Sequence, residues 1–178
     1  FRQRYGIDEP FLLYVGRITP AKNVPELVDD FIRFRQTYRE PLKLVLVGRA
    51  TVDLPQHADV VPVGFVSEQD KFDAIAAATA VVIPSMYESL SMIALEAWLM
   101  ETAVLVNGRS EVLKQQCRRS NGGLHYTNYA EFATGLRYLL QHADVCRRLG
   151  AQGRQFTQSI YNWDVIMEKY RDVIKAEF

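Results

Sequence analysis

Apolar positions along this chain follow two different patterns. Short runs that are apolar at nearly every position predict buried strands, and stretches with helical spacing separate them. The clearest apolar runs lie at 11–16, 42–48, 59–64, 80–85 and 103–107. The helical stretches between them lie at about 24–38, 67–78 and 90–100. Asn23 and Pro25 are suitable start signals for the first of these helices, and Ser67 with Asp70 resembles a capping box at the second.

This alternation predicts a Rossmann-like three-layer α/β domain, in which a mostly parallel sheet carries helices on both faces. A short sixth strand is expected at 123–126, and the pattern beyond Asn128 is helical up to Phe178. The length of 178 residues suits one domain with a sizeable core. We therefore expect a single domain over 1–178, with an α/β core to about 160 and a helical C-terminal tail over about 161–178.

Composition excludes several classes of protein. The 21 basic and 21 acidic residues cancel, which removes the usual electrostatic reason to expect a nucleic-acid partner. Cys117 and Cys146 lack the spacing of zinc or redox motifs, and we expect both thiols to be reduced. The longest uncharged apolar run, 74–86, is too short to span a bilayer, so no membrane contact is expected. Because the chain starts with neither methionine nor a signal peptide, we expect a fragment of a longer protein.

Candidate chemistry begins in the loop after the first strand, because parallel sheets bind ligands at the carboxyl ends of their strands. In this loop, Arg17 offers a planar guanidinium and Lys22 a flexible ammonium, a combination that suits a diphosphate. Neither a G-x-G-x-x-G pattern nor a P-loop is present, which argues against NAD enzymes and P-loop NTPases. Taken alone, however, such charges are more often solvated than ligand-binding.

A second candidate loop runs from Pro84 into the helix that carries Glu96. On one continuous helix, Glu88 and Glu96 would lie roughly 12 Å apart and about 80° around the axis, too far to share a small site. With Glu88 in the loop, the pair would instead border an elongated site, and the amides of residues 89–91 would face it from a helix N-terminus that favours phosphate. The alternative is that Glu88 only complements the helix dipole and Glu96 is exposed to solvent.

Five segments, in their order and spacing, resemble the carboxyl-terminal domain of the group 1 (family four) retaining glycosyltransferases of the two-domain GT-B kind. The segments are 14–28 (YVGRITPAKNVPELV), 44–48 (LVLVG), 63–85 (VGFVSEQDKFDAIAAATAVVIPS), 88–98 (ESLSMIALEAW) and 162–170 (NWDVIMEKY). The chain departs from the family at 89–91, where glycine or phenylalanine is common, and at 106–111, where the usual glycine-rich turn is altered.

The resemblance implies that a nucleoside-diphosphate sugar, such as a UDP- or GDP-hexose, is bound for transfer with retention at the anomeric carbon. Arg17 and Lys22 would bind the diphosphate and neutralise the charge that grows on it, while Glu88 would lie beside the transferred sugar. These three residues are the expected catalytic set. Because positive groups and a helix N-terminus already stand where charge develops, we expect no cofactor and no metal.

The remaining carried-over residues form the expected donor-binding set. Glu96 would accept hydrogen bonds from the ribose hydroxyls, and Leu90 and Ser91 would present amides to phosphate or sugar oxygens. Val66 would meet the nucleobase through its backbone. The full expected set is Gly16, Val66, Ser89, Leu90, Ser91 and Glu96.

In the family that the chain resembles, the active site lies between two domains. The expected partner is therefore an N-terminal acceptor domain that this chain lacks. The isolated chain should then transfer no sugar, and its last helix, near 163–176, should cross back toward the other domain. Two alternatives stay open: one half of a GT-B-like sugar-nucleotide epimerase, and a non-catalytic ligand-binding domain with a flavodoxin-like sheet. We expect a cytoplasmic location, with membrane association of the full-length protein left open because lipid-linked acceptors are common in the family.

Overall fold

The computed structural model describes residues 1–177, with side chains to residue 175. Within this part of the chain, six parallel strands form one sheet in the order β3-β2-β1-β4-β5-β6. The strands are β1 (Phe11–Val15), β2 (Lys43–Val47), β3 (Val60–Gly64), β4 (Ala80–Ile83), β5 (Val104–Asn107) and β6 (Gly123–Tyr126). The predicted parallel sheet and its short sixth strand are confirmed.

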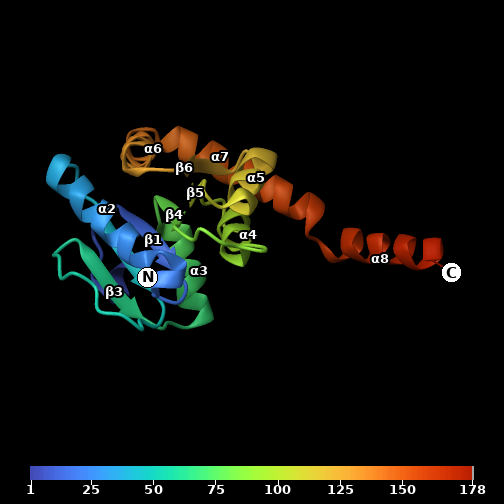
Figure 1. Cartoon of the computed structure of the whole chain (residues 1–178), viewed down its shortest axis with the longest axis horizontal. Helices are drawn as coiled ribbons and strands as arrows, with labels where there is room; N and C mark the ends of the chain where they lie inside the picture. The colour runs from blue at the N-terminus through green and yellow to red at the C-terminus, as the bar shows by residue number, and fades with distance from the viewer. Residues whose placement is uncertain (178) are drawn as a thin grey trace.

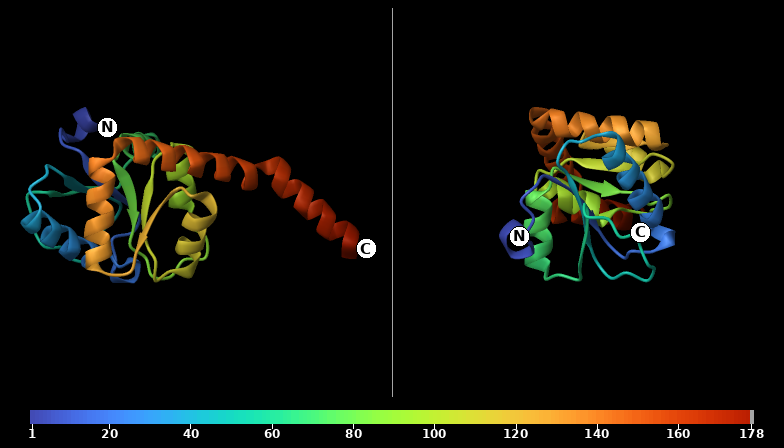
Figure 2. Two further views of the ribbon diagram at one scale, coloured as in Figure 1. Left: turned by 90° about the horizontal axis from the view of Figure 1, so that it is seen from above. Right: turned by 90° about the vertical axis from the view of Figure 1, so that its left-hand side faces the viewer.

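Helices cover both faces of the sheet, as Figures 1 and 2 show. They are α1 (Arg2–Tyr5), η1 (Pro20–Lys22, a 3₁₀ turn), α2 (Val24–Thr37), α3 (Glu68–Ala77), α4 (Met92–Leu99), α5 (Glu111–Ser120), α6 (Tyr129–Gln141), α7 (Ala143–Ile160) and α8 (Trp163–Glu177). The three-layer α/β fold is thereby confirmed. Phe178, the end of the predicted helical tail, lies outside the described residues.

The alternating side chains of β1 show why its sequence is apolar throughout. Leu12 and Tyr14 join a core cluster with α2 and α6, whereas Phe11 and Leu13 join a second cluster with α3, α4 and α5. All four side chains are buried. Successive residues of a strand point to opposite faces, so a strand covered on both sides needs apolar residues at every position.

Two predicted helix starts differ in their chemistry. The Ser67 hydroxyl accepts a hydrogen bond from the Asp70 amide at 3.1 Å, as the capping-box pattern predicts. Asn23 does occupy the N-cap of α2, but its side chain makes no capping bond. Its φ of 59° instead places it in the left-handed region, which asparagine tolerates better than most residues. Pro25 lies in the first turn, as predicted.

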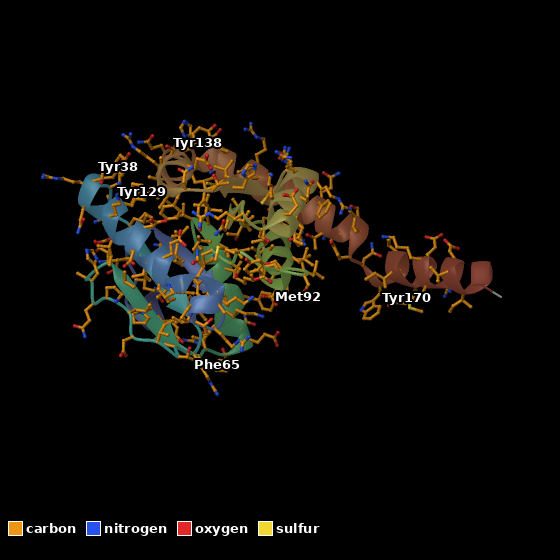
Figure 3. The ribbon with its side chains drawn as sticks, viewed as in Figure 1. Tyr38, Phe65, Met92, Tyr129, Tyr138 and Tyr170 are labelled. Atoms are coloured by element: carbon orange, nitrogen blue, oxygen red, sulfur yellow. The ribbon has the colours of Figure 1, made fainter. Side chains whose placement is uncertain are left out.

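The last helix extends away from the domain body (Figures 1 and 2). Between α7 and α8 the helix is interrupted at residues 161–162, close to the predicted boundary of the tail. Trp163, Met167, Tyr170 and Ile174 recur at helical spacing along α8, and all four side chains are exposed. Figure 3 shows Tyr170 on this helix, clear of the body of the domain. The tail therefore presents an uncovered apolar stripe.

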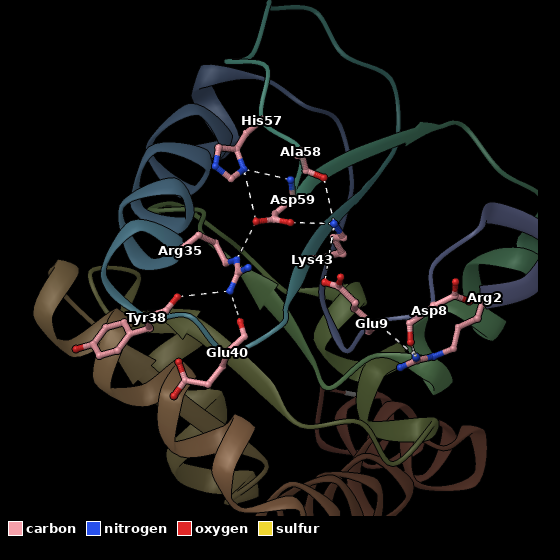
Figure 4. A network of polar contacts seen from close by, with 10 residues as sticks. All are labelled: Arg2, Asp8, Glu9, Arg35, Tyr38, Glu40, Lys43, His57, Ala58 and Asp59. Carbon is pink, nitrogen blue, oxygen red and sulfur yellow. Dashed lines mark hydrogen bonds and ion pairs between the residues drawn. The ribbon is translucent and has the colours of Figure 1, made fainter.

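A polar network ties the amino ends of the strands together (Figure 4). The Asp59 carboxylate, just before β3, accepts hydrogen bonds from Arg35 Nε of α2 at 2.9 Å and from Lys43 Nζ of β2 at 2.8 Å. Arg35 also donates to the backbone carbonyl of Glu40. Burial alone raises the pKa of Asp59, but the hydrogen bonds from Lys43 and Arg35 outweigh it and hold that pKa below its ordinary value.

Candidate functional site

The order of the strands identifies one edge of the sheet as the candidate site. From β1 the chain proceeds outward to β2 and β3, then returns to β4 on the other side of β1. Ligands of open α/β sheets bind at such a switch point, outside the carboxyl ends of the strands. The loops that follow β1 and β4 carry most of the predicted residues, while Val66 follows β3 and Glu96 lies on α4.

Close approach of two strand ends shapes the floor of the site. The Gly16 amide donates to Val47 O at 2.9 Å. A Cβ atom on Gly48 would lie 1.9 Å from Gly16 O, and Gly48 has a φ of +140°. Only glycine fits this position, because a side chain there would collide with backbone. The loop after β1 therefore rests directly on the end of β2.

Lys22 is oriented by the short η1 turn and meets Glu88 across the switch point. The Thr19 hydroxyl accepts a hydrogen bond from the Lys22 amide at 3.2 Å, which caps the turn. Lys22 Nζ donates to Glu88 Oε1 at 2.7 Å, and the Glu88 side chain is 13% exposed. Two predicted catalytic residues from separate loops thus form one ion pair.

Tyr14 supports the backbone beneath Arg17. Its hydroxyl donates to Arg17 O at 2.7 Å, and its ring is buried in the core. Burial raises the pKa of Tyr14, and the negative charge of Glu88 raises it further while Arg17 opposes the shift. The hydroxyl is therefore protonated across the physiological pH range and remains a donor to Arg17 O.

The loop after β4 ends at the N-cap of α4, which is Ser91. Its side chain is only 2% exposed and makes no capping bond, and its Oγ has no hydrogen-bond partner among the described residues. Buried hydroxyls are normally bonded, so an orphan oxygen at a helix N-terminus indicates that a ligand or solvent completes the site. The first amides of α4, those of Met92 and Ile93, precede the hydrogen bonds of the helix and are available to a ligand at this end, whereas the Ala94 amide donates to Ser91 O at 3.1 Å.

Glu96, one turn into α4, pairs with a different lysine from Glu88. Lys71 Nζ of α3 donates to Glu96 Oε1 at 2.8 Å. The prediction that Glu88 and Glu96 serve different parts of an elongated site is consistent with these separate pairings.

Three cavities follow one another along the carboxyl edge of the sheet. The first, of about 610 Å³, lies between β1, β2 and α3 and is lined by Arg17 and Val66. It shares Gly16 with a second cavity of about 260 Å³, which Leu90 and Ser91 also line. Lys22 and Glu88 border both the second cavity and a third of about 610 Å³, which reaches Ser89. Of the predicted residues, Glu96 alone does not line these three cavities, and it connects to the first through Lys71.

Comparison with known proteins identifies the family. Residues 1–156 match the family described as glycosyl transferases group 1. The chain belongs to the group 1 glycosyl transferases. It is 31% identical over 195 residues to the alpha-maltose-1-phosphate synthase of Mycobacterium tuberculosis, covering 96% of this chain and 49% of that protein. An uncharacterized glycosyltransferase of Methanocaldococcus jannaschii is 28% identical over 190 residues, covering 98% of this chain and 47% of that protein.

Solved structures share the architecture of this group 1 domain. Sucrose-phosphate synthase from Thermosynechococcus elongatus superposes with a TM-score of 0.77 at 25% identity, covering 98% of this chain and 48% of that chain. Anabaena HepE in complex with UDP reaches a TM-score of 0.82 at 15% identity, covering 98% and 51%. The chain spans about half the length of the curated relatives it matches.

Sequence reasoning missed three residues of this glycosyltransferase domain. Tyr14 was missed because its sequence context is that of a core residue, and Lys71 was missed because it has the pattern of a surface charge. Asn107 explains the altered turn at 106–111: it is buried, its Nδ2 donates to Pro84 O at 2.9 Å, and its Oδ1 accepts from the Arg109 amide. A buried asparagine directly after an apolar strand was the available signal, since it must find partners at the neighbouring strand end.

Three further observations concern the thiols, membrane-spanning helices and metal ions. Both cysteines are free, as predicted. Within residues 1–177, no helix combines the length and apolar character needed to cross a bilayer. Among the described side chains, no three or more of the metal-ligating types His, Cys, Asp and Glu gather in a way that would hold an ion.

Proposed function

We propose that this chain is the donor-binding half of a retaining glycosyltransferase that uses a nucleoside-diphosphate sugar. The observation that carries the proposal is the row of three cavities, in which the Lys22–Glu88 pair stands where the second meets the third. The first cavity, the cations and helix N-terminus around the second, and Glu88 at the third thus follow one another along a single edge. A nucleoside, a diphosphate and a sugar follow one another in the same order in the donor.

The first cavity suits the nucleoside, with Val66 offering backbone groups to the base. The diphosphate would lie between Arg17, Lys22 and the start of α4, where the orphan Ser91 hydroxyl would gain a partner. The sugar would occupy the third cavity beside Glu88 and Ser89. Fixed donors at these places need no reorganisation during the reaction, which is the basis of electrostatic catalysis.

The proposed reaction breaks the bond between the anomeric carbon and the diphosphate oxygen, and the electron pair stays on the diphosphate. The acceptor hydroxyl forms the new glycosidic bond on the same face, and its proton passes to the departing diphosphate oxygen. Arg17 and Lys22 neutralise the charge that develops on the leaving group. We propose that these cations serve in place of a metal ion.

Relatives support this donor class over the two alternatives. Structures of Anabaena HepE hold UDP and UDP-glucose, and the M. tuberculosis relative is a synthase of alpha-maltose-1-phosphate. Membership of the group 1 family favours glycosyl transfer over an epimerase or a non-catalytic flavodoxin-like domain.

We further propose that an acceptor-binding domain completes the active site and that α8 packs against it. The support is the length of the relatives, about twice that of this chain, and the exposed stripe on α8 whose Trp163 side chain is 76% exposed. A cytoplasmic location is proposed because both thiols are free, as reducing compartments keep them.

The test is calorimetric titration of the chain with UDP and GDP, in EDTA and again with magnesium. We expect saturable binding of at least one nucleotide in EDTA, together with no sugar transfer by the chain alone. Binding that requires magnesium would contradict the metal-free proposal. Absence of binding under both conditions would refute the donor site itself, and robust transfer by the isolated chain would refute the need for a second domain.

A further inference from the structure

Lys71 connects the predicted ribose ligand to the nucleoside cavity. Its ammonium lies 2.8 Å from Glu96 Oε1, and the two side chains are 21% and 23% exposed. A second carboxylate, Glu68, lies 3.8 Å away and is largely exposed, so it competes weakly. The strong contact of Lys71 is therefore the one that bridges α3 and α4.

The position of this pair relative to the cavity is informative. Lys71 lines the first cavity of about 610 Å³, together with Arg17 and Val66, whereas Glu96 does not. Among the hydrogen bonds of the described residues, Glu96 Oε1 accepts from Lys71 and Oε2 accepts none. One carboxylate oxygen is thus fixed by a cation, and the other is available to a ligand.

This arrangement lowers the conformational entropy that the Glu96 side chain loses when a nucleoside binds. A free glutamate side chain loses rotamer entropy when it binds a ligand, and a neighbouring cation that already fixes the carboxylate removes much of that loss. A carboxylate that accepts from a neutral hydroxyl makes a charge-assisted bond, whose strength depends on a well-aligned geometry.

We propose that Lys71 is a positioning residue for donor recognition, which holds Glu96 in the orientation that receives the ribose hydroxyls. This inference rests on the proposed function and adds to it a residue on α3. Because Lys71 acts through Glu96, its contribution should depend on the hydroxyls themselves.

The experiment compares UDP with 2′,3′-dideoxyuridine diphosphate by calorimetry, and GDP with its dideoxy analogue in parallel. In the unaltered chain the dideoxy analogue should bind about tenfold more weakly or worse, because the bonds to the carboxylate are lost. K71M should weaken binding of the natural nucleotide by roughly three- to tenfold and leave that of the analogue unchanged within about twofold. K71R should recover most of the lost affinity. The double variant K71M/E96Q should bind the natural nucleotide no more weakly than E96Q alone.

Lys43→Met is the matched control, because Lys43 is 24% exposed and also pairs with a carboxylate at 2.8 Å, but at the amino end of the sheet. It should leave nucleotide affinity unchanged. Equal weakening of the natural and dideoxy nucleotides by K71M would overturn the inference, since it would mean direct contact with phosphate or base, or a general loss of structure. An unchanged affinity of K71M for the natural nucleotide would also overturn it. K71Q provides the same comparison if K71M does not fold, and failure of the unaltered chain to bind either nucleotide would refute the proposed function instead.

Discussion

The two ends of the sheet carry ion pairs of similar length, 2.7 to 2.9 Å, but their carboxylates differ in how many of their oxygens are bonded. At the amino end, both oxygens of Asp59 accept a hydrogen bond, one from Lys43 and one from Arg35 (Figure 4). At the carboxyl end, Glu88 is bonded through Oε1 to Lys22 alone among the described residues. Close to that pair, the buried Ser91 hydroxyl has no partner.

The difference separates a structural network from a binding site. A carboxylate such as Asp59, whose two oxygens are both bonded within the protein, has no need of a ligand, and it fixes the elements that carry it. Of the buried side-chain atoms described in this cluster, only Glu9 Oε2, 3.8 Å from Lys43 Nζ, lacks a hydrogen bond. A cluster with unused acceptors and an orphan hydroxyl gains hydrogen bonds only when something enters. Removal of a charge should therefore change stability at the amino end and activity or binding at the carboxyl end.

The largest effect is expected from Glu88→Gln in the full-length protein. Because Glu88 is proposed to lie beside the transferred sugar, turnover should fall more than about a hundredfold, the range for loss of one preorganised group that stabilises a transition state. Stability should change by less than about 1 kcal/mol, as for other partly exposed pairs. Turnover and urea unfolding are the two measurements.

Glu101→Gln is the control for that change, because Glu101 also forms an ion pair at 2.7 Å, with Arg154, away from the three cavities. It should leave turnover unaltered. If both variants turn over at the same rate, the carboxyl-end pair is ordinary surface chemistry.

Removal of the cations should have the next largest effect, this time on affinity. Arg17→Ala or Lys22→Met should weaken nucleoside diphosphate binding by about 1.5–3 kcal/mol, the range for hydrogen bonds to charged groups. Calorimetry of the isolated chain measures it, and the exposed Arg39→Ala serves as the comparison. Unchanged affinity in both site variants would place the diphosphate elsewhere.

The opposite pattern is expected at the amino end. Asp59→Asn removes the charge that Lys43 and Arg35 share, which should lower the free energy of unfolding by about 1.5–3 kcal/mol. Nucleotide affinity should be unchanged. The exposed Asp53→Asn, in the same connection between β2 and β3, should have little effect on urea unfolding. Loss of nucleotide binding in the folded Asp59 variant would contradict the separation of the two ends.

The sequence predicts the frame of this molecule better than its contacts. The run at 42–48 identifies a strand because a strand buried on both faces must be apolar throughout. The two loops with candidate site residues, after β1 and β4, are then located from the carboxyl ends of the strands. α1 and η1 have four and three residues, too few to show a helical period. The interruption between α6 and α7 falls at His142, with neither glycine nor proline to mark it.

Among the candidate residues, the family resemblance supplied those that match its motifs, and these stay predictions, whereas residues that act through tertiary contacts were not predicted at all. Nothing in the spacing of Lys71 and Glu96, on two helices, predicts that they meet. Similarly, Tyr14 reads as one more apolar residue of β1, and only the fold shows its hydroxyl beneath Arg17. Such contacts depend on how the elements are arranged in the folded chain, which a local pattern does not encode.

The smallest expected effect is a pH dependence that Asp59 confers at the amino end. The pKa of Asp59 is lowered in the folded chain, so its contribution to stability is complete above the ordinary aspartate value, about 4, and is lost as pH falls through the lowered value. The difference in unfolding free energy between the unaltered chain and Asp59→Asn should therefore be constant from about pH 7 to 5 and narrow below about pH 4. Other carboxylates titrate in both proteins and cancel in this difference. Urea unfolding of the pair at several pH values measures it, and a difference that stays the same down to pH 3 would show that Asp59 acts through its shape and not through its charge.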